Sequence, residues 1–335
     1  MRWDALPGTI SVYAGRLAAP PTWTRHAEAT HYAASTMKLA VLAALYRAAD
    51  IGRLDLDAPA TVHNRFTSAQ PDAPAFSCAR QQDNDDAVWD RLGDRAPLRW
   101  LAERMIVKSS NLATNLLIEH VGLAAVADLW ARVGARHSVT GRGIEDFAAR
   151  DAGITNLVTA ADLADLLDAV ATGAARSGSA SPPSGPAGLA AASPPFGPAG
   201  LAAASPASGP ARSGFPVGSA RRQPVCSPAG SARTEPVVSP AGCAAMLDVL
   251  CAQQIRQDIA EGLPAGTRLA HKNGWVRGVR HGAAVIFPDD APAYLLVVCT
   301  SRPVPDDQPS GRVDRSARHL VADISALVWR HRHDL

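Results

Sequence analysis

The sequence predicts an α+β fold: an antiparallel sheet, formed from N- and C-terminal segments and flanked by helices, with an all-helical region inserted between those segments. Strand-like segments lie near both ends of the 335-residue chain, and apolar helical segments occupy much of its middle. We therefore expect an α/β subdomain formed by residues 1–34 and 257–335, and a helical subdomain formed by residues 35–256.

The predicted strands are short runs of β-forming residues bounded by turn residues. Near the N-terminus, residues 8–15 and roughly 22–32 are bounded by Gly and Pro-Pro. Three runs near the C-terminus are separated by Gly278 and by a Pro-Asp-Asp turn, which is typical of an antiparallel meander. These runs are 268–276, 280–287 and 293–300.

The predicted helical region begins with residues 35–47, which are apolar nearly all round and indicate a helix buried inside the protein. Thr159 is a suitable N-cap for a later helix. Ser239 followed by Pro240 opens another helix, which we expect to continue to Ile255. The other predicted helices are 98–107, 110–121, 123–133, 160–170 and about 312–329.

Residues 173–238 differ from the rest of the chain because they are rich in Ala, Ser, Pro, Gly and Arg. A twelve-residue repeat that starts at Ser181 recurs from Ser193 with one substitution, and begins again at Ser205. So much Pro and Gly, with so few large apolar side chains, cannot offset the entropy lost on ordering. We therefore predict a disordered surface insertion within the helical subdomain.

The composition excludes several classes of protein. The formal net charge is +2, with basic and acidic residues interleaved, which argues against nucleic-acid and membrane partners. Five cysteines without a Cys-x-x-Cys pair predict neither a disulfide framework nor a zinc knuckle, and we expect no metal or cofactor. The first residues do not show the apolar run and small-residue cleavage site expected of a signal peptide, and no apolar stretch approaches the ~20 residues that a membrane span requires. We expect a soluble, monomeric and, as written, cytoplasmic protein, unless the true start lies upstream.

The basic residues are the most unusual feature of the composition, because all but three of the 33 are arginine. The three lysines are Lys38, Lys108 and Lys272, and each lies in or beside a short Ser/Asn/Gly motif. Arginine keeps its proton in proteins, whereas a desolvated lysine can become neutral and act as a base. The lysines therefore mark candidate chemical positions, with codon bias as the alternative explanation.

Ser35 and Lys38 are three residues apart at the start of the predicted buried helix, so their side chains share one face. At a helix N-terminus the macrodipole disfavours a protonated amine and favours negative charge that develops on the serine oxygen. Together these effects describe an activated nucleophile. Ser-x-x-Lys occurs by chance in most chains, so its position at the start of an apolar helix is the informative part.

The other two lysines belong to two further polar motifs. Ser109–Asn111 follows Lys108 at a predicted helix start, where a hydroxyl and an amide two residues apart can relay a proton and bind a substrate amide. A simple Ser N-cap is the alternative. Lys272–Gly274 lies on a predicted strand, where Gly permits close approach of a ligand to the backbone and Lys supplies a fixed positive charge.

In this order along the chain, the motifs at residues 35, 109 and 272 resemble those of the penicillin-recognising serine hydrolases, which are class A β-lactamases and their penicillin-binding relatives. Those motifs are Ser-x-x-Lys, Ser-Asp-Asn and Lys-Thr-Gly. The segment Asn111–Leu117 is also similar to the helix that follows the family's second motif. The resemblance implies a hydrolase that opens β-lactam amides of small molecules through an acyl-serine intermediate, on the β-lactamase/transpeptidase-like fold.

The resemblance implies a role for each matching residue. Ser35 would be the acylated nucleophile, Lys38 its proton acceptor, and Ser109 the relay to the leaving nitrogen. The backbone N–H groups of Ser35 and Trp275 would form an oxyanion hole, where one lost donor typically raises the barrier by about 3–4 kcal/mol. Lys272 would be catalytic as well, because it would hold the pair electrostatically and attract the substrate carboxylate. The implied substrate-binding residues are Asn111 for an amide, then Asn273, Gly274 and Trp275, and Arg280, which lies near a carboxylate-anchoring Arg of some relatives.

Two motif positions and one loop depart from the family pattern. Ser110 replaces Asp and Asn273 replaces Thr, so substrate binding would be altered rather than lost. Class A β-lactamases activate water with a loop Glu in a Glu-x-x-Leu-Asn pattern, whereas residues 142–150 offer Glu145 without the Leu-Asn. Glu145 is either the water-activating base or a solvated loop acid; without a base, the acyl-enzyme would persist, as in a penicillin-binding protein. Lys108 has no catalytic counterpart and is expected at the surface.

Three other interpretations stay open. A metal hydrolase would need ligands such as His331 and His333, the only closely spaced histidines. A Ser-His-Asp hydrolase would lack the Gly-x-Ser-x-Gly elbow, and His271 and His281 are expected to be structural. The non-enzymatic alternative is a sensor or binding module that acylates once, or binds without reaction. The natural substrate is a β-lactam, a D-Ala-D-Ala peptide, or another amide or ester.

Overall fold

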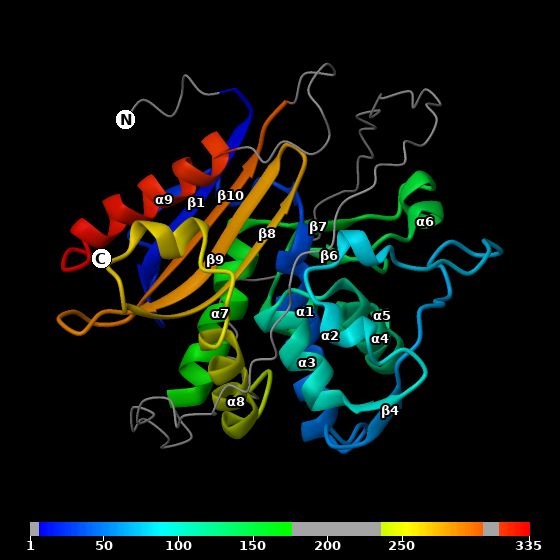
Figure 1. The fold of residues 1–335 in the computed structure, drawn as a ribbon. Coiled ribbons are helices and arrows are strands. Elements are labelled where there is room, and N and C mark those ends of the chain that lie inside the picture. Colours follow the sequence, from blue (N-terminus) through cyan, green and yellow to red (C-terminus); the bar gives the residue numbers. More distant parts are fainter. Residues whose placement is uncertain (1–6, 176–235, 304–314) are drawn as a thin grey trace, which may run out of the picture. The chain divides into compact units, whose positions relative to one another are not determined.

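The computed structural model describes residues 7–175, 236–303 and 315–335. Its main feature is a five-stranded antiparallel sheet in which strands from the two ends of the chain lie side by side, in the order β2-β1-β10-β9-β8 (Figure 1). This arrangement confirms the predicted α+β fold class. The strands are β1 (Thr9–Arg16), β2 (Trp23–Arg25), β8 (Arg268–Val276), β9 (Val279–Phe287) and β10 (Tyr294–Ser301).

The predicted strand at residues 22–32 is divided into two short strands that belong to different sheets. His26 has a φ of 44°, in the left-handed region that interrupts an extended strand, and a turn follows in which Ala29 N donates to His26 O at 2.9 Å. The first part is β2. The second part, β3 (His31–Tyr32), belongs to a three-stranded sheet with β7 (Asn156–Val158) and β6 (Val139–Thr140).

The main sheet is buried on both faces, and neighbouring residues of a strand pack into different cores. On β9, Ala283 and Val285 contact the helical core, whereas Ala284 and Ile286 contact the core on the other face. Because side chains alternate along a strand, Lys272 and Gly274 lie on the same face of β8 as Ala270, which belongs to the helical core. The edge strand β8 therefore directs its motif toward the helices.

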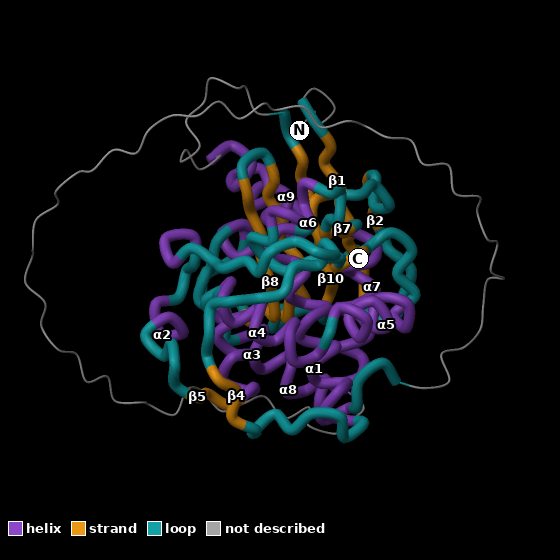
Figure 2. Tube along the Cα trace, turned by 90° about the vertical axis from the view of Figure 1, so that its right-hand side faces the viewer, coloured by secondary structure: helices purple, strands orange, loops and turns teal. Residues whose placement is uncertain are grey.

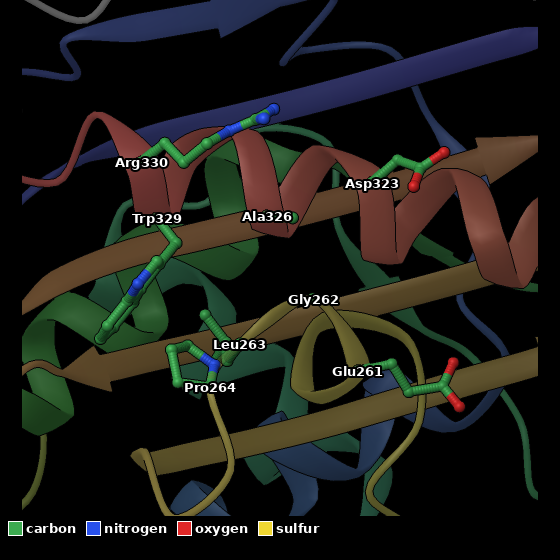
Figure 3. A pocket seen from close by; sticks show the side chains of 8 residues that line it. All are labelled: Glu261, Gly262, Leu263, Pro264, Asp323, Ala326, Trp329 and Arg330. Carbon is green, nitrogen blue, oxygen red and sulfur yellow. The ribbon is translucent and has the colours of Figure 1, made fainter.

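One face of the sheet is covered by α9 (Arg315–Arg330) and the 3₁₀ helix η4 (Asp258–Gly262), which contact each other and the sheet (Figure 1). A cavity of about 500 Å³ lies between these two elements, on the face opposite Gly274 (Figure 3). It is lined by Glu261, Gly262, Leu263, Pro264, Asp323, Ala326, Trp329 and Arg330.

The other face is covered by a layer of helices, in which α7 contacts β1, β9 and β10 while α8 contacts β8 (Figure 2). The longer helices are α1 (Lys38–Asp50), α3 (Leu98–Val107), α4 (Asn111–Val121), α5 (Leu123–Val133), α7 (Ala160–Ala175) and α8 (Pro240–Cys251). The shorter elements are η2 (Ala34–Met37), η3 (Arg80–Gln82), α2 (Asp86–Trp89), α6 (Phe147–Asp151), β4 (Pro59–Thr61) and β5 (Arg95–Pro97).

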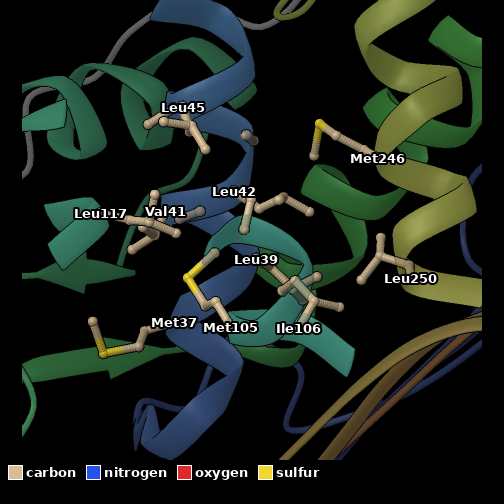
Figure 4. Packing of buried hydrophobic residues seen from close by; sticks show 14 of the residues in the cluster. Met37, Leu39, Val41, Leu42, Leu45, Met105, Ile106, Leu117, Met246 and Leu250 are labelled. Atoms are coloured by element: carbon tan, nitrogen blue, oxygen red, sulfur yellow. The ribbon is translucent and has the colours of Figure 1, made fainter. Parts of the chain in front are cut away.

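The central helix of this layer is α1, which is buried along most of its length, as its all-round apolar sequence predicts. Leu42 and Leu45 pack within the same cluster as Met105, Leu117 and Met246 (Figure 4), and α1 contacts α3, α4, α5 and α8. Each fully buried Leu stabilises the fold by roughly 1.5–3 kcal/mol relative to exposure. This packing fixes the N-terminal end of α1, where Lys38 lies.

Most of the predicted helix boundaries agree with the structure, including the caps. Thr159 Oγ1 accepts from Asp162 N at 3.0 Å, and Ser239 Oγ accepts from Gly242 N at 3.1 Å. The predicted helix that begins at Ser239-Pro240 ends at Cys251, before Ile255. The predicted 173–238 insertion is too long at both ends, because residues 173–175 belong to α7 and Val238 is buried in the helical core. Its middle part, residues 176–235, lies outside the described residues. The division into two subdomains stays a prediction.

None of the described helices is, on its own, long and apolar enough to cross a membrane. The helices α4 and α5 meet the length and composition requirements only as a pair, and they are bent by 87° relative to each other.

Candidate functional site

Ser35 lies in η2, a 3₁₀ turn that immediately precedes α1, and not in the α-helix that the sequence predicts. Its neighbour Ala34 has a φ of 45°, a left-handed conformation that costs about 1–3 kcal/mol in a non-glycine residue. Ser35 itself is partly exposed, and no described residue forms a hydrogen bond with its hydroxyl. The strained turn thus presents Ser35 Oγ beside the buried N-terminus of α1.

The backbone of β8 lies directly against this turn. A β-carbon built on Gly274 would lie 2.7 Å from Ser35 N and 2.9 Å from Thr36 N, distances that real β-carbons do not tolerate. Only glycine fits at this position, because any side chain would meet backbone and not a movable side chain. The structure therefore brings the first and third predicted motifs together. Trp275, which follows Gly274, is partly exposed.

Lys38 is fully buried and bridges the first and second motifs. Its Nζ donates to Ser109 O at 2.7 Å, to Ser109 Oγ at 3.1 Å and to Asn111 Oδ1 at 3.0 Å. Burial lowers the pKa of Lys38 to about 7, and the charge of Asp83 opposes part of that decrease. A substantial fraction of Lys38 is therefore neutral near pH 7, so that its nitrogen can accept a proton.

The second motif lies in the connection between α3 and α4. Ser109 is fully buried and has a φ of 61°, another left-handed conformation in a non-glycine residue. Ser110 is the N-cap of α4, because its Oγ accepts from Ala113 N at 3.1 Å. The alternative of a Ser N-cap is thus correct for Ser110, while Ser109 and Asn111 are left to contact Lys38.

Lys272, in the third motif, is fully buried, and its Nζ donates to Asn273 O at 2.7 Å. Burial lowers the pKa of Lys272 well below its usual value, and the nearby Lys38 ammonium lowers it further. Burial and the neighbouring Lys38 thus both disfavour the charged form of Lys272. An anion bound beside Lys272 would favour its charged form.

Arg280 is buried on β9, and its guanidinium forms an ion pair with Asp258 of η4. Its Nη2 also donates to Gln257 Oε1 at 2.8 Å. The carboxylate of Asp258 is in addition 3.4 Å from Asn273 Nδ2, which also donates to Ile255 O at 3.3 Å. Two residues predicted to bind substrate, Arg280 and Asn273, therefore direct their donors to partners within the protein.

Glu145 lies in the loop between β6 and α6 and has a φ of 65°, a third left-handed non-glycine residue near the site. Its Oε2 accepts from Ala79 N at 2.8 Å, whereas its Oε1 is buried with no hydrogen bond within 3.5 Å among the described residues. Burial raises the pKa of Glu145, and the proximity of Asn111 partly opposes that increase. Because Asn111 also contacts Lys38, Glu145 lies near the second motif.

A pair of histidines lies behind the motifs, on the helical face of the sheet. The rings of His31 and His281 are 5.5 Å apart, and His281 Nε2 is 2.8 Å from Tyr32 O. Burial lowers the pKa of His31 to about 3 and that of His281 to about 4, so both are neutral at pH 7. His271, on β8, has a pKa lowered by burial to about 4. At pH 7 these three histidines are therefore uncharged and add no positive charge to the site.

Within the described part of the chain, no group of three or more His, Cys, Asp or Glu side chains is arranged to hold a metal ion. Of the two candidate metal ligands at the C-terminus, His331 has its Nδ1 3.5 Å from Asp334 Oδ2, and His333 has its Nε2 3.7 Å from Asp290 Oδ2. The described cysteines are Cys78, Cys243, Cys251 and Cys299, and all four are free thiols.

The chain matches the β-lactamase enzyme family over residues 3–182 and 233–332, which is more than half of its length. It belongs to the β-lactamase enzyme family. Membership confirms the resemblance predicted from the three motifs and supports a serine hydrolase. No curated protein matches the chain.

Solved structures similar to this β-lactamase family member cover nearly all of it. PBP-A is 19% identical, with a TM-score of 0.65 over 98% of this chain and 91% of that chain. A β-lactamase from Sphaerobacter thermophilus is 22% identical, with a TM-score of 0.64 over 98% of this chain and 93% of that chain. A β-lactamase from Xanthomonas campestris is 13% identical, with a TM-score of 0.65 over 99% and 93%. At these identities the likeness shows the fold.

Sequence reasoning missed the carboxylate that organises the second motif of this family member. Asp83 Oδ2 accepts from Ser110 Oγ at 3.1 Å, from Asn111 N at 3.0 Å and from Leu112 N at 2.8 Å. It therefore caps α4 from another segment and supplies a carboxylate beside Ser110, the position where the family pattern has Asp. No local signal marks Asp83, since its neighbours Asn84, Asp85 and Asp86 look equally suitable in the sequence.

Proposed function

We propose that this β-lactamase family member opens β-lactam amides through an acyl intermediate on Ser35. The observation that carries the proposal is the position of Lys38: a buried amine with a lowered pKa, one turn after Ser35 and hydrogen-bonded to Ser109 and Asn111. Small-molecule β-lactams are the proposed substrates. A structurally similar PBP-A variant is described as an acyl-enzyme complex with penicillin G.

In the proposed acylation, Ser35 Oγ attacks the lactam carbonyl carbon while its proton passes to neutral Lys38 Nζ. The carbonyl π electrons move to oxygen and form a tetrahedral oxyanion. When the C–N bond breaks, the leaving nitrogen takes a proton from Ser109 Oγ, and the Lys38 ammonium returns a proton to that hydroxyl. The ring opens, Ser35 carries the acyl group, and Lys38 is neutral again.

We propose the backbone N–H groups of Ser35 and Trp275 as the oxyanion hole. The close approach of Gly274 to Ser35 N supports this assignment, because it holds the two N–H groups on facing segments. Donors fixed by backbone cost no reorganisation when charge develops on the oxygen. Asn111 would bind the substrate amide through its side chain.

For deacylation, we propose that Glu145 takes a proton from the attacking water. Its pKa is raised by burial, which makes it a stronger base than an exposed glutamate, and its Oε1 is free to bind water. Water oxygen then bonds to the acyl carbon, the bond from that carbon to Ser35 Oγ breaks, and the proton that Glu145 took from water passes to Ser35 Oγ, either directly or through Lys38. The products are the ring-opened acid and free enzyme.

A second candidate is a penicillin-binding protein that acylates but hydrolyses slowly. It is favoured by the hydrogen bond that fixes Glu145 Oε2 to Ala79 N, which leaves a single oxygen for water, and by the likeness to PBP-A. Both candidates share the acylation step on Ser35.

A time course of intact-protein mass after exposure to benzylpenicillin tests both candidates. An adduct of one penicillin mass that forms and then disappears supports the β-lactamase, and an adduct that persists supports the penicillin-binding protein. Ser35→Ala should form no adduct, while Thr24→Ala, which removes an exposed hydroxyl from β2, should behave as wild type. A wild-type protein that forms no adduct and hydrolyses no β-lactam would contradict the proposal.

A further inference from the structure

A second cavity, of about 310 Å³, opens beside the proposed reactive centre. It is lined by Asn84, Lys108, Gln254, Ile255, Gln257 and Trp275. Lys108 directly precedes Ser109, which contacts Lys38, and Trp275 directly follows Gly274, which packs on Ser35. Since adjacent Cα atoms are about 3.8 Å apart, two walls of this cavity continue into the reactive centre. A substrate held on Ser35 can extend into it.

The walls of this cavity carry one formal charge, the ammonium of Lys108. The other lining residues are amides, an isoleucine and an indole. Lys108 is partly exposed, and no hydrogen bond or ion pair of its ammonium occurs among the residues that the structure describes. It is the C-cap of α3, where the helix macrodipole favours a cation without neutralising it. The ammonium therefore remains free to pair with a ligand.

The acids that are adjacent in the sequence to the lining residues Asn84 and Gln257 already have other partners. Asp85 forms an ion pair with Arg104, and Asp258 forms one with Arg280. Asp83 accepts three hydrogen bonds at the start of α4. Each of these three carboxylates therefore has its own partners, and none of them forms an ion pair with Lys108.

Of the groups expected to bind a substrate carboxylate, Arg280 and Asn273 are engaged inside the protein, and Lys272 is fully buried with its Nζ donating to Asn273 O at 2.7 Å. Asp258 neutralises Arg280, and Asn273 directs its amide N–H groups to Ile255 O and to Asp258. Asn273 Oδ1 has no partner among the described residues, but as an acceptor it repels a carboxylate. Among the described residues, Lys108 on the α3 side of the site therefore has an ammonium without a partner, whereas Arg280 on the β9 side is paired with Asp258.

We infer that Lys108 binds an anionic group, a carboxylate, of the acyl donor in this cavity and thereby selects acidic over neutral substrates. The inference rests on the proposed function and makes it specific. The cavity volume fits one ring with its substituents, at the lower limit of small-molecule sites. Trp275 supplies an apolar wall on which that ring can pack, and the amides of Gln254 and Gln257 can donate to the same carboxylate.

The test compares benzylpenicillin with its methyl ester, which differ in one negative charge. The second-order acylation rate constant is measured by quenched intact-mass spectrometry for wild type, Lys108→Ala, Lys108→Arg and Arg53→Ala. Arg53 is exposed at the far end of α1, so its removal controls for net charge. A lost charge-assisted hydrogen bond corresponds to about a tenfold change.

We expect Lys108→Ala to lower acylation by benzylpenicillin about tenfold and acylation by the ester less than about twofold. Lys108→Arg should stay near wild type because it keeps the charge, and Arg53→Ala should change neither rate. Equal effects of Lys108→Ala on acid and ester, or no effect on the acid, would overturn the inference while the proposed function stands. A wild-type protein acylated by neither compound would overturn both.

Discussion

Gly274 of β8 packs on the backbone of Ser35, so closely that an added β-carbon would lie 2.7 Å from Ser35 N. This contact joins a C-terminal edge strand to the turn before the central helix. It fixes the distance between the two backbone N–H groups proposed to bind the oxyanion. The catalytic proposal therefore depends on a position where only hydrogen fits as a side chain.

Gly274→Ala should disrupt the site because the new methyl group collides with backbone and neither segment can move freely. We expect a destabilisation of about 1–3 kcal/mol, typical of overpacking, and at least a tenfold loss in acylation rate. Gly266→Ala is the matched control, since Gly266 precedes β8, has a φ of 84° and would meet no atom within 4 Å. The control should lose about 1 kcal/mol of stability and keep its acylation rate. Equal acylation by both variants would argue against the contact as a catalytic element.

The acylation rate should rise with pH through a midpoint near 7, the pKa to which burial lowers Lys38. The sign follows from the proposal: the neutral amine accepts the Ser35 proton, and its fraction increases as pH rises above that pKa. Lys38→Arg keeps the charge but cannot become neutral, so acylation should fall by about 10²–10⁴-fold and lose this midpoint. Quenched intact-mass spectrometry from pH 5.5 to 9 measures the acylation rate of wild type and of Lys38→Arg, and the midpoint of its pH dependence. A rate that falls with pH through 7 would contradict the role of Lys38.

Glu145→Gln should slow deacylation without slowing acylation, because the amide cannot take a proton from water. We expect deacylation to fall by about 10²–10⁴-fold, seen as a longer-lived adduct in the mass time course. Glu103→Gln removes a charge from the exposed face of α3 and is the control. If Glu145→Gln deacylates at the wild-type rate, Glu145 is a structural loop acid, and another group must activate the water.

The buried histidines should make the fold sensitive to acid. His31 and His281 have folded pKa values of about 3 and about 4, whereas unfolded histidine titrates near 6.5. Between these values the unfolded state binds more protons, so the free energy of unfolding decreases as pH falls from 6.5 toward 4, by up to about 1.4 kcal/mol per pH unit for each histidine.

Urea unfolding at pH 7, 6 and 5 checks this pH dependence. His281→Asn should be less stable at pH 7 but should show a shallower decrease with pH than wild type. The exposed His319→Asn variant should keep the wild-type slope. A slope for His281→Asn equal to that of wild type would show that His281 does not stay neutral in the fold.

The sequence was sufficient for much of the fold because its signals are local. The Gly278 turn and the β-forming runs on either side of it predict the β8–β9 hairpin, which the structure contains. The all-round apolar pattern of residues 35–47 predicts a buried central helix, and Ser239-Pro240 predicts the start of α8. In each case the residues that decide the structure are neighbours in the chain.

Contacts between distant segments could not be predicted in this way. Asp83 caps α4, and Asp258 neutralises Arg280, only after tertiary packing brings each acid to its partner. The sequence therefore indicated the three motifs but not the two carboxylates beside them. Likewise, residues 22–32 read as one strand, although His26 turns the chain between two sheets.

The most direct test of the central claim is to locate the adduct by tandem mass spectrometry of peptides after brief exposure to benzylpenicillin. The proposal predicts the penicilloyl group on Ser35, within the peptide that contains His31–Lys38, and no modified peptide in Ser35→Ala. A penicilloyl group on any other residue, or a modified Ser35→Ala protein, would contradict the proposal that Ser35 is the nucleophile.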